Sequence, residues 1–404
     1  MAPNPVSKKS VQFIFITTAL DMMGIGLIIP VLPDVIRRFS TSPDQVNQYF
    51  GYFVALYALM QFFASPVLGG LSDRFGRRPI LLCSLLGASL DYLFMAFATS
   101  MPMLFVGRII SGLTGASLTV VNSYMADVSD DSNRSANFGL IGAAFGIGFI
   151  AGPLLGGLLG HYNAMAPFIA AAILNLCNFL FGFFILPESL PIEHRRKLNF
   201  KKLNPFSSLK NLFSQQHLFI FVCTYFLMFL AGQVHPSIWT LYTEYKFSWT
   251  SWQVGISLSF VGLIYGMSQA VLSKKLVPKW GEAKALKVGL FFSAVGFLLY
   301  SAAPFGWMMY VIMLGTCLSA LANPCLQSIM TKQVAPNRQG ELQGDLVSIG
   351  SITSIIAPLL YSKSFDWVVS GRAGFDYSGL PYLIAAAIVF VSWILLMKKL
   401  KIAQ

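Results

Sequence analysis

Twelve apolar runs, each long enough to cross a membrane, divide this chain of 404 residues. A membrane-spanning helix needs about 20 apolar residues in succession. Because 55% of the residues are hydrophobic and only 11% are charged, the composition describes a chain solvated by lipid. The sequence therefore predicts an all-α integral membrane protein in the lipid bilayer. The expected transmembrane helices cover residues 11–33, 47–70, 79–98, 101–126, 135–160, 165–186, 217–242, 252–273, 285–302, 305–331, 340–362 and 379–397.

The one long polar connection separates the sixth span from the seventh and carries six Lys and Arg residues. It predicts an N-terminal six-helix bundle over residues 1–186, a cytoplasmic linker over residues 187–216 and a C-terminal six-helix bundle over residues 217–404. With the N-terminus inside, 22 of the 28 Lys and Arg residues fall in inside segments, as short cytoplasmic loops require. Both termini are therefore expected in the cytoplasm, and the net charge of +12 reflects membrane topology and not a nucleic-acid partner.

A repeat supports this division into two halves. A shift of 205 residues lays Gly152-Pro153 on Ala357-Pro358 and Phe75-Gly76 on Trp280-Gly281. Two copies of one six-helix unit are typical of transporters built from parallel repeats. A chance match of short apolar pieces is the alternative, and the second loop lacks the acid and the double arginine of the first.

The loop of the first half, residues Gly69–Pro79, is called the charged hinge below. It packs an acid and three arginines between two long apolar runs. It fits in full the pattern G-x-x-x-D-R-x-G-R-R of the major facilitator superfamily, which it therefore resembles. The residues at the required places are Gly69, Asp73, Arg74, Gly76, Arg77 and Arg78.

The fifth span matches the antiporter signature G-x8-G-x3-G-P-x2-G-G of the same superfamily. Small residues at these intervals let two helix backbones approach closely, and the proline permits a bend. The alternative is that glycine is simply common in membrane helices. The matching residues are Gly139, Gly148, Gly152, Pro153, Gly156 and Gly157.

Five further stretches resemble the tetracycline–proton antiporters and related twelve-span drug–proton antiporters. They are Leu20–Pro33, Ala55–Gln61, Gly87–Tyr92, Gly107–Ala116 and Gly232-Gln233. The resemblance implies the major facilitator fold of two pseudo-symmetric bundles, proton-driven export by alternating access, a single-chain functional unit and the bacterial inner membrane.

Two departures from the tetracycline exporters concern the second half. Where they carry an acid in the ninth span, this chain reads Leu290–Gly296 without a carboxylate, and where they carry a histidine in the eighth span it has Tyr265. The resemblance therefore favours a drug substrate without favouring tetracycline itself.

Three ionisable residues lie inside predicted spans: Asp21, Asp91 and Arg108. Inserting such a residue at the centre of a membrane helix costs roughly 2.5–3.5 kcal/mol of free energy on insertion scales. At a rise of about 1.5 Å per residue, all three residues can lie near the middle of the bilayer. We expect Asp21, and with it Asp91, to bind the coupling proton while Arg108 favours the ionised acid. A static ion pair that only locks helices is the alternative.

Polar and aromatic residues within the spans predict a cavity for flat, amphiphilic molecules. His235 could titrate near neutral pH or simply pack, and any single polar residue can merely bond one helix to another. Asn323-Pro324 is expected to break the tenth span. The candidate cavity residues are Tyr57, Gln61, Asn122, Gln233, His235, Trp239, Tyr265, Gln269, Asn323 and Gln327.

The charged hinge is expected to act as a cytoplasmic gate. The family resemblance places Asp73 against the positive N-terminal end of the eleventh span, close to Asp345. The contact between Asp73 and the eleventh span would act as a latch between the two halves, and the corresponding loop of the second half is not expected to form one. Asp127 belongs to a further inner cluster that is either a gate latch or a solvated turn.

Function classes other than transport have little support in the sequence. No nucleotide-binding G-x-x-x-x-G-K-[ST] loop and no H-E-x-x-H motif occurs, and the five cysteines stand singly without metal-ligand spacing. We expect no enzyme activity, cofactor or metal. The leading hypothesis is a proton-coupled antiporter that exports amphiphilic small molecules; the alternative is an exporter or proton symporter of a specific metabolite such as a sugar, amino acid or siderophore.

Overall fold

The computed structural model describes residues 8–115, 117–129, 134–195, 218–334, 339–374 and 377–402, and these residues form helices joined by short turns. Ten helical segments are long and apolar enough to cross a membrane, and two bent helix pairs raise the number to twelve if each pair is one span. This confirms the predicted all-α membrane fold. Most of the linker lies outside the described residues.

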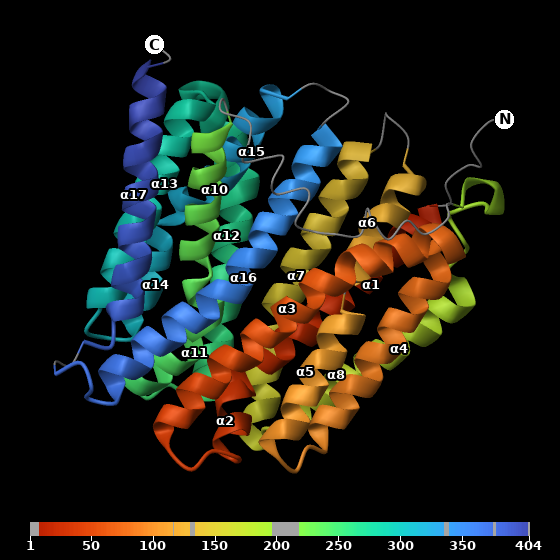
Figure 1. Ribbon diagram of the computed structural model, residues 1–404, viewed down its shortest axis with the longest axis horizontal. Helices are drawn as coiled ribbons and strands as arrows, with labels where there is room; N and C mark the ends of the chain where they lie inside the picture. The colour runs from red at the N-terminus through yellow and green to blue at the C-terminus, as the bar shows by residue number, and fades with distance from the viewer. Residues whose placement is uncertain are drawn as a thin grey trace. The chain divides into compact units, whose positions relative to one another are not determined.

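The helices in chain order are shown in Figure 1. They are α1 (Lys8–Ile28), α2 (Leu32–Arg37), α3 (Pro43–Phe75), α4 (Arg77–Ala96), α5 (Met101–Thr114), α6 (Ser117–Asp127), α7 (Arg134–Tyr162), α8 (Ala166–Ile185), α10 (Phe219–Gly232), α11 (Val234–Phe247), α12 (Ser251–Trp280), α13 (Glu282–Ala302), α14 (Trp307–Gly315), α15 (Ala322–Lys332), α16 (Gln339–Val369) and α17 (Leu380–Ile402), with 3-10 turns η1 (Ile29–Val31), η2 (Ile192–His194) and η4 (Cys317–Leu321).

Contacts within the chain group its residues into two units. The first unit comprises Met1–Ser40, Leu59–Asn204 and Thr250–Ser259, and the second comprises Thr41–Ala58, Pro205–Trp249 and Phe260–Gln404. Each unit therefore contains most of one sequence half and one helical segment from the other. The bundle boundaries expected at residues 186 and 217 stay a prediction.

In the first unit, α1 packs along α7 and α8, while α4 packs on α5 and α8 (Figure 1). The α1–α7 contact depends on glycine. A Cβ atom at Gly148 would lie 2.5 Å from the Ala19 carbonyl oxygen, and one at Gly152 would lie 2.7 Å from that of Met23. Any larger residue there would have to push the two backbones apart.

Pro153 lies inside α7 and contacts α12 of the same unit. A Cβ at Gly255 would overlap the Pro153 carbonyl oxygen. Proline leaves a carbonyl of the preceding turn without its helical partner, and nearby the Ser259 hydroxyl donates to the Ile150 carbonyl oxygen at 2.6 Å. The Ser259 hydroxyl of α12 therefore adds a hydrogen bond to α7 close to its proline.

The second unit repeats this arrangement with Pro358 of α16 and Gly51 of α3. A Cβ at Gly51 would lie 3.0 Å from the Pro358 carbonyl oxygen. Pro153 and Pro358 are the residues that the 205-residue shift superposes. The same proline-to-glycine contact thus occurs once in each unit.

The turns at Gly76 and Gly281 also follow the repeat. Gly76 has a φ of 106° and Gly281 a φ of 76°, a region that residues with a side chain rarely adopt. Each glycine is the single residue between two helices, α3 and α4 or α12 and α13. The charged hinge is therefore mostly helical, because α3 continues through Asp73 to Phe75 and a single glycine suffices for the turn.

Several spans are interrupted, and the tenth span breaks at a different place from the predicted one. Its helix α14 ends at Gly315, η4 follows, and α15 begins at Ala322; the two parts are bent by 47°. Pro324 lies in the first turn of α15, where a helix does not need the missing N–H. The break therefore precedes Asn323-Pro324.

Candidate transport site

A buried carboxylate marks the core of the first unit. Asp91 of α4 is 1% exposed, and its Oδ2 accepts a hydrogen bond of 2.5 Å from the Ser111 hydroxyl of α5. Among the described residues, its Oδ1 has no hydrogen-bond partner. A Cβ at Gly107 would lie 3.3 Å from that oxygen, so the glycine leaves the carboxylate room. A buried polar atom without a partner is rare and calls for an explanation.

The structure brings Arg108 to the same carboxylate. Arg108 follows Gly107 on α5, and its charge acts on Asp91. Burial disfavours a charged acid, whereas a donated hydrogen bond and a nearby cation favour it. The balance among these three influences is what a proton-binding group needs. The motif search missed Ser111, although its place one turn after Gly107 is a usable signal.

Asp21 lies on α1, half-buried, one turn before Gly24. A Cβ at Gly24 would lie 3.0 Å from Nδ2 of Asn175 and 3.6 Å from the Tyr92 ring. This part of α1 therefore packs against α8 and against the residue that follows Asp91 in α4.

Two asparagines of α8 form a polar face that the sequence search also missed. The Thr17 hydroxyl donates to Asn178 Oδ1 at 3.0 Å, and Asn178 Nδ2 donates to the Thr17 carbonyl oxygen at 3.3 Å. Asn175 Nδ2 donates to the Ala171 carbonyl oxygen at 3.0 Å, while its buried Oδ1 has no partner in the described part of the chain. Their three-residue spacing in an apolar span could have identified them.

The charged hinge is organised around Arg77, which is 7% exposed. Its Nη1 donates to Asp73 at 2.5 Å and to Ser72 Oγ at 2.7 Å, and its Nε donates to Asp127 at 2.9 Å. One guanidinium therefore ties the end of α3 to the end of α6. Asp127 is therefore part of this bonded cluster, and its role as a gate latch or as a solvated turn stays a prediction.

Glu188, a residue that sequence analysis did not select, caps the helix after the hinge. Its carboxylate accepts hydrogen bonds from the backbone N–H groups of Arg77 at 2.8 Å and Arg78 at 3.3 Å. Negative charge at a helix N-terminus is favourable. Arg78 Nη2 also donates to the Phe183 carbonyl oxygen at 2.7 Å, so the hinge is fastened to the end of α8.

The other expected gate residues have separate surroundings. The Arg74 guanidinium lies over the Phe75 ring, 5.1 Å from its centroid, and a Cβ at Gly69 would contact Thr119 at 3.4 Å. Asp345 is buried in α16. The expected latch of Asp73 against the eleventh span joins residues of the two units and stays a prediction.

The second unit has an ion pair at the place that corresponds to Arg77, although its loop lacks the acid and the double arginine of the charged hinge. Glu282, at the start of α13, accepts hydrogen bonds from Lys332 Nζ at 2.7 Å and from the Ser328 hydroxyl at 2.6 Å. The 205-residue shift superposes Glu282 on Arg77 and Lys332 on Asp127. An ion pair is thus present at the same place in both units, but the acid and the base have exchanged positions. A comparison that looks for the same charge at corresponding positions does not detect such a pair.

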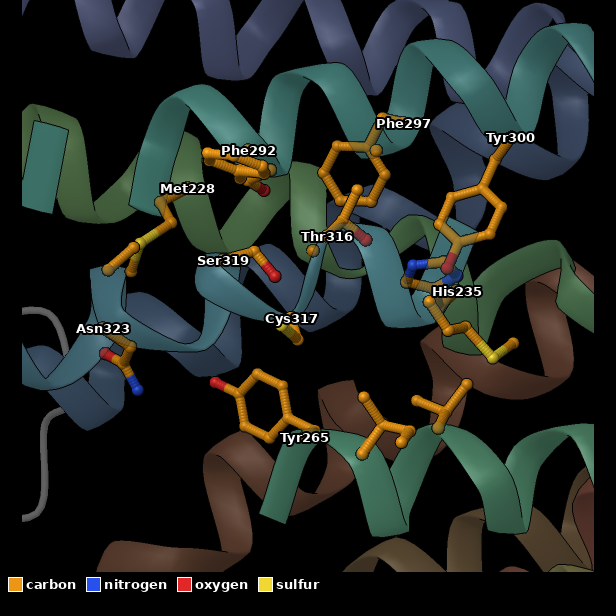
Figure 2. A pocket seen from close by; sticks show the side chains of 17 residues that line it. Met228, His235, Tyr265, Phe292, Phe297, Tyr300, Thr316, Cys317, Ser319 and Asn323 are labelled. Atoms are coloured by element: carbon orange, nitrogen blue, oxygen red, sulfur yellow. The ribbon is translucent and has the colours of Figure 1, made fainter. Parts of the chain in front are cut away.

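A cavity of about 330 Å³ lies within the second unit, between α10, α11, α12, α13, α14, η4 and α15. Among the described residues that line it there is no Asp, Glu, Lys or Arg. Figure 2 shows Phe292, Phe297 and Tyr300 along one wall and Tyr265 across from them. Of the ten predicted cavity residues, His235, Tyr265 and Asn323 belong to this lining.

His235 lies in a cage of aromatic rings at one end of the cavity. Its ring centroid is 5.2 Å from that of Trp239, 5.3 Å from that of Tyr300 and 5.5 Å from those of Phe297 and Tyr382. Its Nδ1 lies 3.4 Å from the Tyr382 hydroxyl. Trp239 does not line the cavity itself but packs against the His235 ring, which does.

The remaining predicted cavity residues lie outside this lining. Gln233, at the break between α10 and α11, donates to Ser354 of α16 at 2.6 Å, and Gln327 donates to Asn323 at 3.1 Å. Gln61 donates to the Gly115 carbonyl oxygen at 3.0 Å, where α5 ends. Tyr57 is on α3, Asn122 is an exposed residue of α6, and Gln269 is in α12 with its side chain outside the described part.

The fold and these features define a class: a multi-pass membrane transporter whose ionisable group and cavity lie inside helical units. The model of the Major Facilitator Superfamily matches residues 14–358. The chain therefore belongs to the major facilitator superfamily.

Individual relatives agree with this membership. The chain is 39% identical to tetracycline resistance protein, class C, of Escherichia coli over 95% of this chain and 96% of the relative. It is 29% identical to multidrug resistance protein 2 of Bacillus subtilis over 91% of each. The fold is similar to that of the human organic anion transporter MFSD10, with a TM-score of 0.73, 24% identity and coverage of 97% of this chain and 100% of that chain.

Proposed function

We propose that this protein exports amphiphilic, drug-like small molecules in exchange for protons, by alternating access. It is a secondary transporter of the bacterial inner membrane, works as a single chain, and keeps both termini in the cytoplasm. The similarity to tetracycline and multidrug resistance proteins supports a drug substrate.

The observation that carries the proton coupling is the buried Asp91 carboxylate. One of its oxygens is held by Ser111 and the other has no hydrogen-bond partner among the described residues. A carboxylate so placed can take up a proton on its unpartnered oxygen, and Arg108 compensates its charge once the proton leaves. The charge of the Asp91 carboxylate then couples proton release to drug binding, because the proton and a bound drug both depend on whether this acid is ionised.

The glycines of α7 connect this chemistry to movement. Gly148, Gly152 and Gly156 hold the backbone of α7 against α1, and α1 carries Asp21. A shift of α7 during the transport cycle therefore changes the surroundings of Asp21 directly. The charged hinge moves as one body with the ends of α6 and α8, because Arg77 bonds to Asp127 of α6 and Arg78 bonds to the Phe183 carbonyl oxygen of α8.

Reconstituted vesicles test the proposal. Purified protein in proteoliposomes should drive accumulation of ethidium when a pH gradient is imposed, and an ionophore that dissipates the gradient should stop it. A panel with a neutral dye and with labelled sugars and amino acids separates drug export from metabolite transport. Transport of a metabolite alone, or ethidium movement indifferent to the pH gradient, would contradict the proposal.

A further inference from the structure

The cavity of the second unit has a lining suited to an uncharged ring system. Its walls carry Phe292, Phe297 and Tyr300 from α13 and Tyr265 from α12 (Figure 2). Aromatic side chains bind flat ligands by offset stacking and edge contacts. Because the described lining offers no side chain of opposite charge, an ion moved into the cavity would lose its hydration without compensation.

A small number of polar groups lies at the two ends of the cavity. Figure 2 shows His235 at one end and Asn323 at the other, with Ser319 and Cys317 between them. These groups come from places where spans are interrupted, after α10 and along η4. A mostly apolar pocket with few polar groups is the usual form of a small-molecule site.

The cavity has free room at one identifiable position. Gly232, the last residue of α10, belongs to the lining, and a Cβ there would meet no atom within 4 Å. At Gly296, in contrast, a Cβ would lie 3.2 Å from the Thr316 side chain. The volume of about 330 Å³ is at the lower end for pockets that enclose drug-sized ligands, so it suits part of an amphiphile.

We propose that this cavity is a binding subsite for the uncharged aromatic part of the transported molecule, separate from the Asp91 carboxylate of the first unit. The inference rests on the proposed drug export and adds the chemistry of the substrate. A neutral, flat, fused-ring compound should therefore bind to the full-length protein without a proton gradient.

A binding experiment with the neutral dye N-phenyl-1-naphthylamine tests the subsite. The full-length protein in nanodiscs should bind the dye, and Gly232→Leu should weaken the affinity at least about tenfold because leucine fills the open volume. Gly266→Leu is the matched control: Gly266 of α12 has equally open surroundings and is not a lining residue. Gly266→Leu should bind as the unmodified protein does.

Thiol protection supplies a second readout that does not depend on a substituted glycine. Cys317 belongs to the lining, whereas Cys177 is exposed on α8 of the first unit. The dye should slow alkylation of Cys317 by N-ethylmaleimide and leave the rate at Cys177 unchanged, as measured by mass spectrometry.

Dye binding and thiol alkylation can both be measured without transport activity. If ethidium transport proves independent of protons while Gly232→Leu weakens dye binding and Cys317 is protected, the proposed coupling fails and the subsite stands. Absence of dye binding, or equal affinity in Gly232→Leu together with unprotected Cys317, would overturn the subsite even in an active exporter.

Discussion

The two units place different chemistry on related scaffolds. In the first unit a buried acid, Asp91, meets a hydroxyl and a cation, Ser111 and Arg108. The cavity of the second unit is lined by aromatic rings without an acid or a base among its described residues. The two proposals therefore assign charge to the Asp91 site of the first unit and ring recognition to the cavity of the second.

The turns at Gly76 and Gly281 sharpen this comparison. Both glycines have positive φ and both precede a helix whose first residue forms an ion pair, Arg77 with Asp127 and Glu282 with Lys332. The signs of the two pairs are exchanged. The backbone geometry of the repeat is therefore maintained where the charges are not.

Among the substitutions that compare the two units, Asp91→Asn should have the largest effect. Asparagine keeps the size of the side chain and can accept the Ser111 hydrogen bond through its amide oxygen, but it cannot exchange a proton. We expect the initial rate of pH-driven ethidium transport in proteoliposomes to fall by about a hundredfold or more, the scale on which loss of an essential proton-transfer group acts. Asp91→Glu is the control that retains an acid, and an unchanged rate in Asp91→Asn would remove Asp91 from coupling.

Arg77→Ala should lower thermal stability more than alanine at the other two arginines of the charged hinge. It leaves Asp73 and Asp127 without their shared cation, and a lost hydrogen bond to a charged group costs about 1.5–3 kcal/mol. We expect a decrease of several degrees in Tm, measured by the intrinsic fluorescence of the protein in detergent. Arg74→Ala removes only a cation that lies over Phe75 and should leave Tm nearly unchanged; equal losses would contradict the role of Arg77.

The exchanged ion pair of the second unit should give the smallest effect. Lys332→Glu places an acid beside Glu282 and should cost about 0.2–1 kcal/mol, since the Lys332 side chain is 67% exposed. The double variant Glu282→Lys with Lys332→Glu restores opposite charges and should recover the Tm of the unmodified protein. If the double variant is no more stable than Lys332→Glu alone, the pair has no role in holding α13 to α15.

The spans and the repeat could be predicted from sequence because lipid imposes length and apolarity on every span. The 205-residue shift places Gly76 on Gly281, because each turn of one residue between two helices requires a glycine at that position. Interruptions such as the one at Thr316 left no comparable mark, because Gly, Thr and Ser, which occur there, are also common inside continuous membrane helices.

The candidate site was harder to predict. Glu188 reaches the hinge from a segment more than a hundred positions along the chain, so no local pattern could connect them. Three of the ten candidate residues line the cavity of the second unit, and the others stay predictions, because spans that are apolar on all faces do not reveal which face turns inward. Ser293 and Gly296 line it too, and they belong to the run in the ninth span that was noted for lacking a carboxylate.

Proton coupling through the acids of the first unit is the central claim, and Asp21→Asn tests it together with Asp91→Asn. The variant should be reconstituted in vesicles, with pH-driven ethidium transport and gradient-free ethidium exchange measured on the same preparation. We expect pH-driven transport to fall to the level of protein-free vesicles while exchange persists, because the variant still binds and moves the dye but cannot carry the proton. Undiminished pH-driven transport by Asp21→Asn would contradict the account.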